Sequence, residues 1–137
     1  MGLYLCAFDG DEEIDGVEVG SYADFNFFRD AVVAAVEEGV RGSRCPTLVS
    51  HHDSDGEWSA EESSRLIGEL DLIGKALSEL PPVEFNSPWK GKVASSLGLK
   101  PKTLLECFFD VDGEPLVDRL RDLAGKSVGK GVPILFQ

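Results

Sequence analysis

The sequence predicts an α/β or α+β fold over residues 1–137, a single domain in which a small mixed sheet packs against about four helices. The length of 137 residues is close to the commonest domain size, which favours one core. Apolar residues make up 42% of the chain, enough to build that core. Short apolar runs are interspersed with longer segments of helical spacing, and no linker or repeat separates them. The order of the strands stays open.

The N-terminal part is predicted to contain two strands and a helix. Residues 2–8 (GLYLCAF) form a short apolar run typical of a buried strand, and residues 17–19 favour a second strand after the polar turn region 9–16. Ser21 can cap the helix that follows, and Asp24 three residues later suits the positive end of the helix dipole. The buried stripe of this helix is predicted to contain Phe25, Phe28, Val32 and Val36.

The middle of the chain is predicted to contain a strand and two helices. Pro46 introduces residues 47–51, which favour a strand. Ser59 and Glu62 have the spacing of a capping box, and the helix they start ends before the proline pair at 81–82. Its buried side is predicted to contain Leu66, Leu70, Ile73, Leu77 and Leu80. Ser87 and Pro88 are typical of a third helix start, with Trp89, Val93 and Leu97 facing inward.

The C-terminal part is predicted to end in a helix and a strand. Residues 107–111 (CFFDV) fit either a strand or the end of a turn, and spacing does not decide between them. After the turn DVDGE, helical spacing places Leu116, Leu120, Leu123 and Ser127 on one side of a helix. Residues 133–136 (PILF) favour a final strand.

Charge is the strongest signal in the composition. The chain has 25 acidic and 13 basic residues, a net charge of −12. Such a surface repels nucleic acid and anionic membranes, whereas a basic protein partner would be steered toward it. No apolar run is long enough to cross a bilayer, and the start of the chain lacks signal-peptide features. The three cysteines form no CxxC motif, which suits reduced thiols in the cytosol.

Three acidic turns follow predicted strands. They are DGDEE at 9–13, DSDGE at 53–57 and DVDGE at 110–114. If the strand ends lie side by side, the turns form one negative rim. The last two both lead into a helix, which a shared turn and helix start explains.

Trp58 lies at the end of the stretch DSDGEW. If the ring is exposed, it is a natural anchor for a protein partner, because tryptophan is enriched at binding hot spots. The commoner arrangement is a tryptophan that folds back over the core. The sequence leaves both positions open.

Residues 51–62 match a calcium loop over much of their length. If Asp53 is position 3 of an EF-hand loop, Asp55 and Glu62 fall at positions 5 and 12. His51 would then be position 1, where a nitrogen ligand suits a hard cation poorly. A turn followed by a capped helix explains the same residues, and we favour it. A calcium-binding module at 51–62 is one alternative function.

A second alternative is a small metal-dependent hydrolase that uses Asp53, Asp55, Asp110 and His51. Carboxylates and an imidazole can bind metal or act as general bases. Adjacent strand residues point to opposite faces, so His51 and His52 would not share one metal. No HExxH, nucleophile elbow, P-loop or dinucleotide fingerprint accompanies them. We therefore expect no enzyme activity and no cofactor.

The two ends and the middle of the chain together resemble the immunity protein 70 family of bacterial polymorphic toxin systems. The resemblance lies in the segments GSYADF, DGEW, DVDGEPL and PILFQ, and it covers nearly the whole chain. None of these segments is a chemical motif, so no active or binding residue is carried over from the family. The family pattern has a single histidine before DxDGEW, where this chain has His51 and His52.

The resemblance implies a cytoplasmic antidote that binds a cognate toxin domain and blocks it. An acidic antidote suits a basic toxin such as a nuclease, whose phosphate-binding groove an acidic rim would occupy. An aromatic side chain would supply the desolvated anchor. From charge and position we predict a partner-binding set and leave the oligomeric state open. The set is Asp53, Asp55, Glu57, Trp58, Asp110, Asp112 and Glu114.

Overall fold

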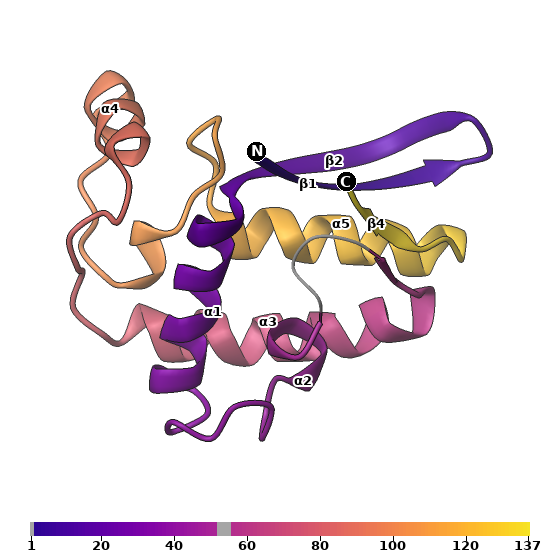
Figure 1. The fold of residues 1–137 in the computed structure, drawn as a ribbon, viewed down its shortest axis with the longest axis horizontal. Helices are drawn as coiled ribbons and strands as arrows, with labels where there is room; N and C mark the ends of the chain where they lie inside the picture. Colours follow the sequence, from indigo (N-terminus) through magenta and orange to yellow (C-terminus); the bar gives the residue numbers. More distant parts are fainter. Residues whose placement is uncertain (1, 52–55) are drawn as a thin grey trace.

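The computed structural model of the chain describes residues 2–51 and 56–137. Strands β1 (Gly2–Asp9), β2 (Glu12–Ser21), β3 (Glu57–Trp58) and β4 (Ile134–Phe136) form one sheet in the order β2-β1-β4-β3 (Figure 1). The predicted mixture of helices and strands is confirmed. All pairings between these strands are antiparallel, so the fold is α+β and the expected mixed sheet has no parallel pair in the described part of the chain.

A long hairpin of β1 and β2 forms one side of the sheet. The predicted strand at residues 2–8 is confirmed, and Leu3, Leu5 and Ala7 are buried. The second strand is longer than the predicted 17–19. Pairing with β1 continues through the acidic residues to Asp9 and Glu12, so the turn shrinks to the hairpin tip. A partner strand therefore extends β2 into residues whose polarity favours a turn.

Helix α1 (Tyr22–Ala35) begins where the sequence predicts. Ser21 and Asp24 form a capping box, in which each side chain accepts from the other residue's backbone amide. The predicted stripe is buried, since the most exposed of its members, Val36, has a relative exposure of only 3%. Local capping and helical spacing therefore fix this helix.

The predicted strand at residues 47–51 is wrong. Residues Pro46–Val49 form the short helix α2. The Thr47 and Leu48 amides donate to the Glu69 carboxylate at 3.1 and 3.0 Å, and Arg29 donates to the Leu48 carbonyl at the other end of the helix. These two charged groups satisfy backbone groups that a strand would have paired in a ladder.

Helix α3 (Ala60–Ser78) follows β3 and begins at the predicted capping box. The Ser59 amide donates to Glu62 Oε1 at 3.0 Å, and the Glu62 amide donates to Ser59 Oγ at 3.1 Å. The four predicted stripe residues inside the helix are fully buried. Leu80 lies beyond the helix end and is 36% exposed, so its predicted inward position is wrong.

Helix α4 (Pro88–Leu97) stands apart from the other helices (Figure 1). Its predicted start at Ser87 and Pro88 is confirmed, but Leu97 is 56% exposed and not inward. Lys90 takes a buried place instead, with its Nζ donating to Asn86 Oδ1 at 2.7 Å. Burial lowers the pKa of Lys90.

Asp24 ties α4 to the body. Its carboxylate is 3% exposed and accepts from the Ser87 hydroxyl, from the Asn86 amide at 2.9 Å and from the Trp89 indole at 2.9 Å. Burial alone would raise the pKa of Asp24, but the hydrogen bonds from Ser87, Ser21 and Trp89 outweigh it and hold the pKa well below its usual range. This carboxylate was predicted only to interact with the helix dipole, but it also joins α1 to the start of α4.

The C-terminal part begins with a single turn of 3-10 helix, η1 (Leu105–Cys107). Residues 107–111, left undecided by the sequence, are mostly irregular, with an isolated bridge between Phe109 and Pro115. Helix α5 (Leu116–Lys130) and strand β4 then follow as predicted.

Helices α1, α3 and α5 lie on the same side of the hairpin (Figure 1). Side chains from the sheet and from these helices form one buried apolar cluster, to which Leu5, Phe28, Leu70 and Leu120 belong. In the described part of the chain, no helix combines the length and apolarity needed to cross a membrane.

Candidate partner-binding surface

The acidic turns lie at separate places around the sheet. Residues 9–13 span the tip of the β1–β2 hairpin. Glu57 lies on β3, at the edge of the sheet opposite β2. Residues 110–114 lie beside β2, where the Val111 amide donates to the Glu18 carbonyl at 3.1 Å. The side-by-side strand ends required for a single rim are therefore not found in the described segments.

The predicted acids differ in what they do. Glu57, Asp112 and Glu114 are exposed. Asp110 is only 2% exposed, and its Oδ1 accepts from the backbone amides of Asp112 and Glu114 at 2.9 and 3.0 Å. Asp110 therefore shapes its own turn, and its carboxylate is not displayed to a partner. Asp53 and Asp55 lie outside the described residues.

The prediction of an exposed Trp58 is wrong, because its ring is fully buried. The ring packs edge-on to Phe136 at 4.7 Å between centroids and beside His51 at 5.5 Å. Its indole N–H donates to the Thr47 carbonyl at 2.9 Å. Trp58 lies on β3 opposite Ile134, a register that turns its side chain toward the core. This tryptophan anchors β3 and α2 and is not a surface anchor.

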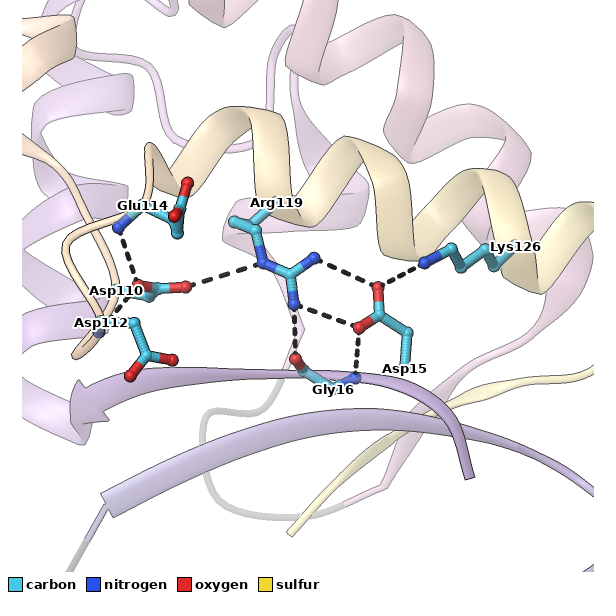
Figure 2. A network of polar contacts seen from close by, with 7 residues as sticks. All are labelled: Asp15, Gly16, Asp110, Asp112, Glu114, Arg119 and Lys126. Carbon is cyan, nitrogen blue, oxygen red and sulfur yellow. Dashed lines mark hydrogen bonds and ion pairs between the residues drawn. The ribbon is translucent and has the colours of Figure 1, made fainter. Parts of the chain in front are cut away.

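Arg119 on α5 connects the turn at 110–114 to the hairpin (Figure 2). It binds the Asp15 carboxylate through two nitrogens, at 3.1 and 3.2 Å, and donates to the Gly16 carbonyl at 2.7 Å. Its Nε lies 3.7 Å from Asp110 Oδ2, and Lys126 adds a bond to Asp15 at 3.0 Å. The same guanidinium therefore joins β2 and the acidic turn at 110–114 to α5.

These contacts shift the pKa values of both partners. Partial burial alone would raise the pKa of Asp15, but hydrogen bonds from Arg119 and Lys126 lower it below its usual range. The hydrogen bond to Asp15 raises the pKa of Arg119. Both groups are therefore charged at neutral pH, and they pair with each other within the fold.

Replacing Arg119 with methionine is expected to lower the free energy of unfolding by about 2 kcal/mol. The change leaves the partly buried carboxylate of Asp15 without its two-pronged partner. Arg119→Lys should not restore stability, because an ammonium lacks the planar fork. Urea unfolding gives the measurement. Arg121→Met is the matched control on the same helix, since the Arg121 pair with Asp71 is half exposed and should matter little. Equal losses in Arg119→Met and this control would contradict the prediction.

The described part of the predicted calcium loop forms a helix cap. One carboxylate oxygen of Glu62 accepts from the Ser59 amide, and His51 Nε2 lies 2.9 Å from the Glu57 carbonyl. His51 also stacks on Phe136 at 4.1 Å. Within residues 2–51 and 56–137, no three His, Cys, Asp or Glu side chains come together as a metal site. His52, like Asp53 and Asp55, lies outside these ranges.

The strands carry exposed acids that the turn motifs did not reveal. Glu13 and Glu18 on β2 are exposed and were not among the predicted residues. None of the four described strands contains a lysine or an arginine, so the strands themselves carry only negative charges. Alternation along VEV, in which Val17 and Val19 are buried, is the sequence signal that could have placed Glu18 outward.

Basic residues gather elsewhere. Residues 85–105 contain four lysines and no acid, and they include the whole of α4. All 25 acidic residues therefore lie in the rest of the chain. A basic partner would be attracted to the sheet and repelled by the α4 region.

A comparison with protein families finds a match to the model described as Immunity protein 70, over residues 3–136. No curated protein and no solved structure matches the chain. The family match covers essentially all of the elements described above.

Proposed function

The chain belongs to the immunity protein 70 family, and on this premise we propose that it binds a cognate toxin domain of a polymorphic toxin system and neutralises it. The protein acts in the cytoplasm, by occlusion and without chemistry of its own. The family match over residues 3–136 carries this proposal. Two residues of the predicted set stabilise the fold instead. Trp58 is fully buried and Asp110 bonds within its own turn, and both keep the surrounding surface in one shape for binding.

An acidic face is the part of the molecule that we propose to meet the toxin. Glu57, Asp112 and Glu114 are exposed and come from the predicted set, while Asp53 and Asp55 are retained as predictions outside the described residues. A toxin with a basic groove, such as a nuclease, would be attracted by this charge. Carboxylates in that groove would take the place of substrate phosphates and block access.

The first experiment pairs this protein with the C-terminal domain of the large secreted protein encoded beside it. Co-expression should remove the toxicity of that domain, and calorimetry should show a tight complex. A well-folded neighbouring domain that neither binds nor is neutralised would contradict the immunity role for this pair.

Binding is expected to weaken by about tenfold or more as ionic strength rises from about 0.05 M to about 0.5 M. Salt screens the attraction between separated charges and slows association. Calorimetry or stopped-flow fluorescence across this range gives the measurement. An affinity that does not change with salt would contradict charge mimicry while leaving the immunity role intact.

A further inference from the structure

In the described part of the chain, no helix covers the face of the sheet opposite α1, α3 and α5. Leu3, Leu5 and Ala7 belong to the buried core cluster, whereas Tyr4 and Phe8, which alternate with them on β1, do not. Leu135 on β4 is likewise outside that cluster, although its neighbours Ile134 and Phe136 belong to it. Side chains alternate between the two faces of a strand, so Tyr4, Phe8 and Leu135 point to the side away from the helices.

The strand register places three acids on the same face. Glu18 lies opposite Tyr4, and Glu13 lies opposite Phe8, on β2. Glu57 lies opposite Leu135, on β3. Directly opposed residues in antiparallel strands project to one face. We call this surface the open face. It has an apolar centre of Tyr4, Phe8 and Leu135, and it is bordered at both edges of the sheet by Glu13, Glu18 and Glu57.

The centre of the open face is built more like an interface than like a solvated sheet surface. The face of an antiparallel sheet that contacts water normally consists of polar residues. On this face, however, β1 has Tyr4, Cys6 and Phe8. Cys6 is fully buried beneath its neighbours, and Tyr4 and Phe8 remain partly exposed. Partly exposed aromatic side chains on a rigid strand supply large contact area at little cost in side-chain entropy.

Tyr4 is held in place before any partner arrives. Its hydroxyl donates to Glu13 Oε1 at 2.6 Å, and this hydrogen bond, together with partial burial and the nearby negative charges, raises the pKa of Tyr4 to about 12. The ring lies over Gly16, where an added Cβ would be 1.9 Å from the hydroxyl oxygen. Glycine at this position therefore makes room for a fixed tyrosine. Fixing an aromatic ring in advance reduces the ordering cost of binding.

The charge around this centre selects the partner. Glu13, Glu18 and Glu57 are exposed, and in the described part of the chain no ion pair neutralises them. The cations that contact the hairpin, Arg119, Lys126 and Lys130, pair instead with Asp15 and Asp9. The border of the open face is thus uniformly negative, which suits a surface of lysine and arginine whose aliphatic stems cover aromatic rings.

We propose that the open face is the docking surface for the toxin domain, and that the toxin meets it with a basic surface. The inference rests on the proposed function and adds the place of binding. Tyr4 and Phe8 are the anchors, and the three glutamates orient the partner. The acidic loop at 110–114 adjoins the edge of β2, where the Val111 amide donates to the Glu18 carbonyl, so the exposed Asp112 adds negative charge beside this border.

Two triple variants with the same change in net charge test the place of docking. One reverses the border, with Glu13→Lys, Glu18→Lys and Glu57→Lys. Its matched control reverses three exposed acids remote from the open face, Glu38→Lys, Glu79→Lys and Glu84→Lys. Calorimetry should show the dissociation constant rising at least about tenfold for the border variant and less than about threefold for the control. Melting temperatures establish that both are folded.

A second pair of variants tests the anchors. Tyr4→Ser with Phe8→Ser should weaken binding by about tenfold or more, whereas Leu72→Ala, at a 40% exposed position on α3, should leave it unchanged. If the anchor variant does not fold, amide spectra of the labelled wild type replace it. Adding unlabelled toxin should then shift the signals of residues 13–18 and not those of α3.

The outcomes separate this inference from the proposed function. A wild-type protein that does not bind the toxin overturns the proposed function. Tight wild-type binding with equal losses in both triple variants shows attraction by net charge alone and overturns the open face as the docking site. Unchanged binding by the border variant, or toxin-induced shifts confined to α3, overturns it as well.

Discussion

Replacing Trp58 with alanine is expected to lower the free energy of unfolding by about 3–5 kcal/mol. The ring is fully buried, packs against Phe136 and His51, and donates its N–H to Thr47. Truncation leaves a cavity between the short strand β3, the end of β4 and α2. Urea unfolding followed by far-UV circular dichroism measures the loss.

The same variant distinguishes a core tryptophan from a binding anchor. Leu72→Ala is the control, because Leu72 is 40% exposed and its truncation leaves no cavity. Trp58→Phe should recover part of the stability by filling the space, although the Thr47 carbonyl loses its donor. A Trp58→Ala protein that is stable but binds the toxin more weakly would contradict the core role and would support Trp58 as an exposed binding anchor.

Replacing Asp24 with alanine should cost about 3 kcal/mol, because several buried donors lose one shared acceptor. Asn86, Ser87 and Trp89 all donate to this carboxylate from the segment that begins α4. Hydrogen exchange should show faster opening of α4, while the core of α3 responds only to the global loss. Asp30→Ala, on the same helix, is the control, since the Asp30 side chain is 74% exposed.

The Asp24 contribution should depend on pH in a defined direction. Its pKa is held well below the usual value, so its contribution is complete above the unfolded-state pKa of about 3.9 and declines as pH falls below it. The stability difference between the wild type and Asp24→Asn should therefore shrink as pH falls from about 5 to about 2. A constant difference across this range would contradict the role of the ionised carboxylate.

Local signals in the sequence predicted most of the elements. The Ser21 cap placed the start of α1, the capping box of Ser59 and Glu62 placed the start of α3, and Ser87 with Pro88 placed the start of α4. These signals succeed because capping and helical spacing involve residues within one or two turns of each other. Burial near the helix ends was less well predicted, because Leu80 lies beyond the end of α3 and Leu97, the last residue of α4, is exposed.

The strand predicted at residues 47–51 failed for a reason outside that segment. Its apolar and β-branched residues favour a strand, but Glu69 binds the first amides of α2 and Arg29 binds a carbonyl at its end. Glu69 is 22 positions from Thr47 along the chain, so no local pattern includes it. Tertiary hydrogen bonds override propensity in a segment this short.

By itself, the sequence determined the class of the fold, the acidic character of the molecule and the family resemblance that the comparison bears out. It could not determine which acids face outward. Asp110 and Glu114 belong to one acidic motif, yet Asp110 is buried by its own turn and Arg119 while Glu114 is exposed. Tertiary structure decided this, because strand register and long-range ion pairs, not composition, set the direction and surroundings of each carboxylate.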